Sequence, residues 1–455
     1  MNRSSNTQRL VLLICLILPS CSSDDAEIRR APSAPLQPDI VVARPAAPAA
    51  NSACALESSG VVTIERPMFP SRADSPSFGY SFRVHPGTDP DAPTVIYLPG
   101  GPGEASIGER NPELLPDAYT LVQTDPRGVG CNAPGALALP GALAAEAPSD
   151  VAHYPLDFYD SVAIADDVLG IVREMALDDY VLYGISYGTL LATLVASRAA
   201  TEGLAPPRAV LLEGVLGRAF TRDGEVEASF QEHWRTVRDG LPEAVRAQLV
   251  TAPLPLGLSA EQWGAGLTTL LSLATIAPPD SLAESLLLSL DPEASDEERQ
   301  SLYDTVLSLN ESEIDAFGLR MHEAVACHEI TETNFRALAL VDGELVRTEA
   351  YCTSDPLDRP FEAGDWPITS PLYYFSGSDD PNTPPWQAQA HYDAMLGAPR
   401  WLVSVIAAGH NPLAFNLLDC QPALWAAVIA GSGFADAVAS CPWPTALASA
   451  PAEPR

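Results

Sequence analysis

The sequence predicts an α/β protein: a mainly parallel central sheet with helices on both faces and an inserted helical segment. Short apolar runs rich in β-branched and aromatic residues recur from about residue 60, and helical patterns lie between several of them. From about 228 to 350 the apolar spacing is instead helical, and convincing strand patterns are absent. Strands that alternate with helices indicate a parallel sheet, because parallel neighbours need crossover connections.

The strand-like runs open with a pair that predicts an antiparallel hairpin, VVTIERP and YSFRVHP. Buried strands are predicted at 94–100, 119–125, 180–184, 208–214, 371–377 and 400–406. Helices are predicted at 157–176, 188–200 and near 421–431. In sheets of this kind, sites form at the carboxyl ends of the strands.

Chain length and the helical region together predict the domain organisation. The chain has 455 residues, of which 47% are apolar, enough for one large core with an insertion or for two domains. We expect a core in two parts, 54–227 and 365–445, separated by a helical insertion at 228–364 and followed by a tail at 446–455.

The charge of the chain is strongly acidic, with 25 basic against 59 acidic residues and a net charge of -34. Phosphate backbones are bound by basic patches, so we expect no nucleic-acid partner. An acidic surface favours solubility. The alternative interpretation is an acidic pocket that attracts cationic substrates.

The first 20 residues predict a signal peptide. The apolar run at 10–18 follows a segment with two arginines and is too short to span a bilayer, which takes about 20 residues. LPSC (18–21) resembles a bacterial lipobox, with an unusual Pro19, and makes Cys21 the lipidation site and membrane anchor. The Pro/Ala-rich segment 21–53 predicts a tether. We therefore predict an exported lipoprotein of the bacterial cell envelope; a periplasmic or secreted protein is the alternative.

Cysteine content agrees with export. Beyond Cys15 and Cys21, six cysteines remain, and six cysteines allow 15 pairings. An oxidising compartment favours disulfides, although some could be buried thiols. No pair has the C-x-x-C spacing of a zinc site. We expect no metal and no cofactor.

The strongest motif is G-x-S-x-G at 184–188, between an apolar strand and an apolar helix. That context is the one a nucleophile elbow requires. The serine, Ser186, is then the nucleophile, and the start of the helix supplies backbone N–H groups for an oxyanion, with Tyr187 as one donor. A simple glycine-rich turn is the alternative.

A serine nucleophile needs a base, and the base needs a partner that orients it. Of the seven histidines, only His410 directly follows a C-terminal strand, in WLVSVIAAGHNPL. The preceding strand ends in Asp379 and Asp380, which gives the chain order Ser, Asp, His of the α/β-hydrolase fold. Spacing alone does not choose between the two aspartates.

A glycine-rich loop, YLPGGPGEAS, follows the first predicted parallel strand. Its position fits the loop that donates the second oxyanion N–H, which we assign to Gly101. No G-K-[ST] follows, so a phosphate-binding loop is not indicated.

Together these motifs resemble the prolyl-aminopeptidase and tripeptidyl-aminopeptidase family of α/β-hydrolases. The matching motifs, in order, are GGPG (100–103), DPRGVG (125–130), GISYGT (184–189), DPNTP (380–384) and GH (409–410). In the family's D-P-x-T-P motif the leading aspartate completes the triad, which implies Asp380. Many members carry His before GGPG, whereas the tripeptidyl branch commonly carries Pro, as at Pro99 here.

The resemblance also implies that the helical insertion is a lid. It further implies three disulfides. Its C-terminal segment has two cysteines that flank a short helix, which implies Cys420–Cys441. A C-x-[DE] element of the lid, followed by a second cysteine, implies Cys327–Cys352. Cys54–Cys131 is then the remaining pair. Asp125 and Arg127 of DPRGVG are expected to brace the active-site loops.

Enzymes of this family cleave near the free amino terminus, and a buried ammonium needs a carboxylate. Glu329, in the lid, and Glu213, just after a core strand, are the candidates. The alternatives are a solvated helix glutamate for Glu329 and a strand-end hydrogen bond for Glu213. We therefore predict an exported serine exopeptidase whose partners are peptides with a free N-terminus. The alternatives are an esterase for small esters and a non-catalytic surface binding protein.

Overall fold

The computed structural model describes residues 60–108, 115–133, 158–221, 224–251, 253–272, 282–310, 321, 322, 324–331, 338–348 and 357–452. Its centre is a nine-stranded sheet of order β1-β2-β4-β3-β5-β6-β9-β10-β11. The strands are β1 (Val61–Pro67), β2 (Ser77–His85), β3 (Thr94–Leu98), β4 (Thr120–Thr124), β5 (Tyr180–Ile185), β6 (Ala209–Glu213), β9 (Leu372–Gly377), β10 (Arg400–Val405) and β11 (Thr445–Ala450). The strands from β4 to β10 pair in parallel, and antiparallel strands stand at both edges. The predicted fold class is confirmed.

Helices cover both faces of the sheet because its central strands are apolar on both sides. In β5 every residue is buried. Leu182 belongs to the hydrophobic core on one face, and Tyr183 to the core on the other. Successive side chains of a strand point to opposite faces, so an uninterrupted apolar run predicts burial on both.

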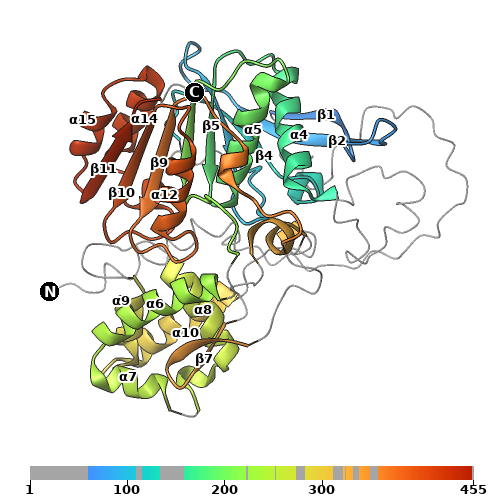
Figure 1. Cartoon of the computed structure of the whole chain (residues 1–455). Coiled ribbons are helices and arrows are strands. Elements are labelled where there is room, and N and C mark those ends of the chain that lie inside the picture. The colour runs from blue at the N-terminus through green and yellow to red at the C-terminus, as the bar shows by residue number, and fades with distance from the viewer. Residues whose placement is uncertain are drawn as a thin grey trace, which may run out of the picture.

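Three helices pack on the face that carries Leu182: α4 (Ser161–Glu174), α5 (Tyr187–Thr201) and α12 (Pro385–Ala394). The opposite face is covered by α14 (Gln421–Ala430) and α15 (Phe434–Ala439), through residues such as Trp425 and Phe434. Figure 1 shows α4 and α5 on one side of the sheet and α14 and α15 on the other. None of the helices in the described ranges is long and apolar enough to cross a membrane.

A helical insertion separates β6 from β9 and forms a second layer below the sheet in Figure 1. Its helices are α6 (Glu225–Gly240), α7 (Glu243–Leu249), α8 (Ala260–Ser272), α9 (Leu282–Leu287) and α10 (Asp296–Asn310), and a π-helical turn follows at Ala326–Ile330. Helix α6 buries Val226, Phe230 and Trp234, which are spaced four apart on one side. The domain boundaries themselves stay predictions.

Two strand elements differ from the sequence-based expectation. The insertion contains an antiparallel hairpin, β7 (Leu338–Val341) and β8 (Glu344–Arg347), where no strand was expected. The segment expected to be a tail contributes most of β11, which pairs with β10 at the sheet edge. Both are short, and β11 consists mainly of small residues (TALASA), so neither carries a strong apolar alternation.

Candidate active site

Ser186 stands on a sharp bend between β5 and α5. Its backbone has φ 55° and ψ -120°, a conformation that is strained for any residue with a Cβ. The flanking glycines make the bend possible. A Cβ on Gly188 would lie 2.0 Å from the Leu98 carbonyl oxygen, and one on Gly184 would lie 2.2 Å from the Gly188 carbonyl oxygen. Only glycine fits on either side of the serine.

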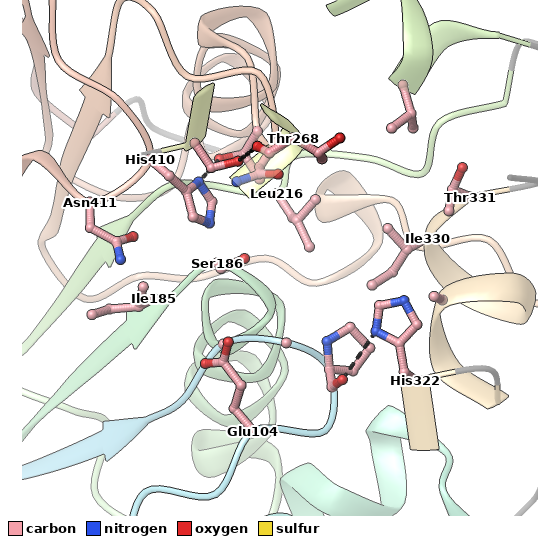
Figure 2. Close-up of a pocket in the computed structure, with 18 of the residues that line it drawn as sticks. Glu104, Ile185, Ser186, Leu216, Thr268, His322, Ile330, Thr331, His410 and Asn411 are labelled. Carbon is pink, nitrogen blue, oxygen red and sulfur yellow. Dashed lines mark hydrogen bonds between the residues drawn. The ribbon is translucent and has the colours of Figure 1, made fainter. Parts of the chain in front are cut away.

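The bend places Ser186 in the wall of a cavity of about 230 Å³. The core contributes the loop after β3 and the loops after β9 and β10, and the insertion contributes the end of α8 and the turn at Ala326–Ile330. Figure 2 shows the Ser186 side chain below the His410 ring, with both facing this cavity. The cavity therefore lies at the carboxyl ends of the parallel strands.

His410 is held by Asp380, which follows β9. The Nδ1 atom of His410 lies 2.8 Å from Asp380 Oδ2, and the Thr383 hydroxyl donates to the same oxygen at 2.6 Å. The other oxygen, Oδ1, accepts the backbone N–H groups of Asn382 and Thr383 at 2.9 and 3.0 Å. Asp379 instead accepts a hydrogen bond from Ser378 Oγ at 2.7 Å. The structure thus pairs Asp380, and not its neighbour, with the histidine.

The environment of His410 raises the pKa of its imidazole above the usual value. Burial alone would lower the pKa, but the charge of Asp380 and its hydrogen bond outweigh burial, and the charges of Glu104 and Glu213 add to them. Within the described part of the chain no hydrogen bond joins Ser186 Oγ to His410. Such bonds are often long in unliganded hydrolytic sites and shorten when substrate binds.

The two expected oxyanion donors are Gly101, in the loop after β3, and Tyr187, the residue after Ser186. Gly101 lines the cavity, and a Cβ on its neighbour Gly100 would lie 3.2 Å from Ser186 Cβ. Tyr187 begins α5, and its ring is buried, with its hydroxyl 2.8 Å from Ser161 Oγ. Neither the Gly101 nor the Tyr187 backbone N–H donates a hydrogen bond to the described residues. The oxyanion roles of the two N–H groups stay predictions.

A family comparison agrees with this architecture. The family described as alpha/beta hydrolase fold matches residues 93–417, most of the chain. The chain belongs to the α/β-hydrolase family. No curated protein matches it.

Several solved α/β-hydrolase structures are similar to the chain at low identity. A proline iminopeptidase from Mycobacterium smegmatis is 16% identical, with a TM-score of 0.40, over 83% of this chain and 99% of that one. An esterase from a Rhodococcus species is 15% identical, with a TM-score of 0.43, over 81% and 98%. A thermophilic esterase from Thermogutta terrifontis is 13% identical, with a TM-score of 0.43, over 81% and 99%. These likenesses carry no information on substrate.

The structure does not bring Glu213 to the cavity of the hydrolase. Its Oε1 accepts the backbone N–H groups of Leu413 and Ala414 at 2.8 and 3.0 Å, and Tyr183 donates its hydroxyl to Oε2. The carboxyl is fully buried, and both of its oxygens accept hydrogen bonds from described residues. The assignment of Glu213 to the substrate amine is wrong, and the strand-end hydrogen bond, its alternative, is what the structure shows.

Glu329 is also turned away from the cavity, although Ala326 and Ile330 of the same turn line it. Its Oε1 accepts the Ser161 N–H at 3.2 Å at the start of α4, and Arg359 lies 3.8 Å from it. The side chain therefore joins the insertion to the core, and its assignment to the substrate amine is corrected in the same way. Burial, with the nearby charge of Asp160, raises the pKa of Glu329 to about 7.

This raised pKa predicts a pH-dependent stability that Glu329→Gln removes. A carboxyl whose pKa rises on folding stabilises the protein below its unfolded pKa and loses that contribution as pH rises through the folded pKa, here from about 4.5 to about 7. Wild type should lose roughly 3 kcal/mol of unfolding free energy across this window relative to Glu329→Gln. Urea denaturation at pH 5 and pH 8 measures the difference, and parallel pH profiles would contradict it.

Glu104 is an acidic side chain of the cavity that sequence reasoning missed. It follows the GGPG loop directly, is exposed, and lines the same cavity as Ser186. Its Oε2 atom lies 3.1 Å from the point a Cβ on Gly100 would occupy, and Ser186 Cβ lies 3.2 Å from that point. Its place next to an oxyanion loop was the available signal.

The remaining predicted groups have these positions. Asp125 accepts the Ser106, Ile107 and Cys131 backbone N–H groups at 2.5, 2.8 and 2.8 Å, and Arg127 pairs with Asp167 at 2.7 Å.

Cys420 and Cys441 form a disulfide. Cys131 and Cys327 are also disulfide-bonded, but Cys54 and Cys352 lie outside the described residues, so those two pairings stay predictions. Cys21, with the signal peptide and tether, lies outside them too.

Proposed function

We propose that this hydrolase is an exported serine peptidase that cleaves amide bonds near the free N-terminus of peptides. One observation carries the proposal: Ser186, on a strained bend, shares a cavity with a histidine that Asp380 holds by its Nδ1 atom. A strained backbone of this kind persists at functional sites, and here it holds Ser186 in the cavity that His410 also lines. The ordered motifs shared with the prolyl- and tripeptidyl-aminopeptidases support the peptide substrate.

The reaction follows from the positions of these groups. Ser186 Oγ attacks the scissile carbonyl carbon while His410 Nε2 takes its proton, and Asp380 stabilises the imidazolium that forms. The backbone N–H groups of Gly101 and Tyr187 bind the oxyanion. His410 then gives the proton to the leaving amine as the C–N bond breaks. Water, deprotonated by His410, then attacks the acyl carbon; the bond from that carbon to Ser186 Oγ breaks as His410 returns the proton to Oγ, and the acid is released.

The lining of the cavity supports a substrate rich in hydrogen-bond donors. None of the described residues that line it is Lys or Arg, whereas Glu104 contributes a carboxylate. The Oδ1 atoms of Asn382 and Asn411 are buried there without a partner among the described residues. A protonated α-amine and an amide N–H satisfy such a wall, and a simple ester brings neither. Glu104 therefore takes the role proposed for the amine-binding carboxylate.

The experiment that tests this function compares aminoacyl and tripeptidyl amides with their N-acetylated forms. Acetylation removes the positive charge of the substrate's α-amine, which we propose that the cavity binds. The value of kcat/KM should therefore fall at least about 100-fold. Equal hydrolysis of blocked and free substrates, or faster hydrolysis of small esters than of any amide, would make the chain an esterase. Failure of a fluorophosphonate to label the protein would instead support a non-catalytic role.

Glu104→Gln is expected to reduce the preference for a free amine roughly 10- to 100-fold, because a hydrogen bond to a charged group is lost without a change of shape. The same substitution removes one of the charges that raise the pKa of His410. Since the base must be neutral, activity is lost as pH falls through that pKa. The acid limb of the kcat/KM profile should therefore move to lower pH. An unchanged profile and an unchanged preference would contradict both roles.

The cellular location is part of the proposal. Lipidation of Cys21 would tether the catalytic domain to a membrane of the bacterial envelope. Cys21→Ser should release the protein from the membrane fraction, and membrane retention of that variant would contradict the anchor.

A further inference from the structure

Asn411, the residue after His410, occupies a capping position but does not cap. It is the N-cap of α13 (Pro412–Phe415), where an asparagine side chain normally accepts the N–H of the second or third helical residue. Those residues are Leu413 and Ala414, and both donate instead to Glu213 Oε1, at 2.8 and 3.0 Å. Glu213 therefore does the capping that the local sequence assigns to Asn411.

Because Glu213 caps α13, the Asn411 carboxamide is not needed there, and Asn411 lines the cavity instead. Figure 2 shows it extending from its own loop towards Ser186, beside Ile185. Its Oδ1 is buried and accepts no hydrogen bond from the described residues. An acceptor in that state destabilises the unliganded protein unless a donor reaches it. A ligand in the cavity is placed to supply the donor.

The reaction narrows the identity of that donor. His410 must hand its proton to the leaving atom of the substrate, and Asn411, the next residue of the chain, lines the same cavity as His410. The leaving nitrogen of a peptide carries an N–H, and the leaving oxygen of an ester carries none. An acceptor here distinguishes the two substrate classes at the scissile bond itself.

We propose that Asn411 Oδ1 accepts a hydrogen bond from the scissile N–H of the substrate and makes this hydrolase selective for amides over esters. The inference rests on the proposed peptidase function and adds its specificity-determining residue. Asn382, the second asparagine with an unpartnered Oδ1 in the cavity, belongs to the turn that holds Asp380, and its backbone N–H donates to that residue at 2.9 Å. It serves as the matched comparison.

The test uses a peptide and its depsipeptide twin, in which oxygen replaces only the scissile NH. Both are assayed as kcat/KM with purified wild type, Asn411→Ala, Asn411→Asp and Asn382→Ala. For Asn411→Ala we expect the peptide value to fall about tenfold and the depsipeptide value to change less than about twofold. Asn411→Asp retains an acceptor oxygen and should restore most of the wild-type ratio on the alkaline plateau, where His410 is neutral. Asn382→Ala should lower kcat/KM for both substrates alike, because its turn also holds Asp380, and should leave their ratio near that of wild type.

Three results would overturn the inference. An equal fall on both substrates means that Asn411 only positions the His410 loop, and no fall on either means that it does not meet the substrate. A lower ratio in Asn382→Ala alone assigns the role to the other asparagine. If wild type cleaves peptides and any of these holds, the inference fails while the peptidase function stands. If wild type cleaves only the depsipeptide, the proposed function fails as well. The melting temperature of unliganded Asn411→Ala should be no lower than that of wild type, because the substitution removes a buried acceptor that has no donor among the described residues.

Discussion

Ser186→Ala is expected to lower kcat for amide hydrolysis roughly 10⁴- to 10⁶-fold. The substitution removes the atom that forms the acyl-enzyme. Residual turnover would come from binding and from the oxyanion site alone. The measurement is single-turnover hydrolysis of a fluorogenic amide, with fluorophosphonate labelling as a second readout that should disappear.

The fold should survive the change, because alanine meets the same backbone strain as serine at φ 55° and because the Ser186 hydroxyl makes no hydrogen bond to the described residues. Ser229→Ala is a matched control: its hydroxyl bonds to a carbonyl of its own helix α6, at 3.4 Å, and Ser229 is not among the described residues that line the cavity. Ser229→Ala should keep wild-type rates. Full activity in Ser186→Ala with complete loss of labelling would show that the labelled serine is not the nucleophile of amide hydrolysis.

The nucleophile and the fold could be predicted because their signals are local. One short stretch contains a buried strand, a G-x-S-x-G bend and an apolar helix. A nucleophile elbow is made of these three elements in this order. The contacts that orient the carboxyl groups of Glu213 and Glu329 are not local. Glu213 follows a core strand as expected, but its acceptors are taken by N–H groups 200 and 201 residues further along the chain. The sequence placed Glu213 correctly at the end of a strand, but it could not show which groups its carboxyl would contact.

The assignment of Glu329 failed for the same reason, because its partner Ser161 lies at the start of a helix that is 168 residues away in the chain. Glu104 was missed for a different one: an exposed glutamate after a glycine-rich loop is not distinguished by sequence from a solvated one. The choice of Asp380 over Asp379 came from the motif resemblance, and the geometry adds a reason, because the turn at 380–383 points two backbone N–H groups at one carboxylate oxygen.

Those two N–H groups predict a large effect for Asp380→Asn. They require an acceptor at the position of Oδ1, so the carboxamide of asparagine must place its oxygen there and its NH₂ at the position of Oδ2. The NH₂ then faces His410 Nδ1 at the 2.8 Å separation now occupied by a carboxylate oxygen. A donor at this place forces Nδ1 to be the acceptor and leaves the proton on Nε2. That tautomer cannot take the proton of Ser186, and the imidazolium also loses its counter-charge.

We therefore expect Asp380→Asn to lower kcat about 10⁴-fold while the folded structure persists. Thr383→Val separates orientation from charge: it removes the hydroxyl that donates to Asp380 Oδ2 at 2.6 Å but keeps the carboxylate. Its kcat should fall only about tenfold, because the lost contacts, to Asp380 Oδ2 and to His410 Nδ1 at 3.2 Å, are those of one neutral hydroxyl. The measurement is kcat of both variants on the alkaline plateau of the pH profile. An asparagine variant as active as the valine variant would mean that the tautomer of His410 is set by something other than Asp380.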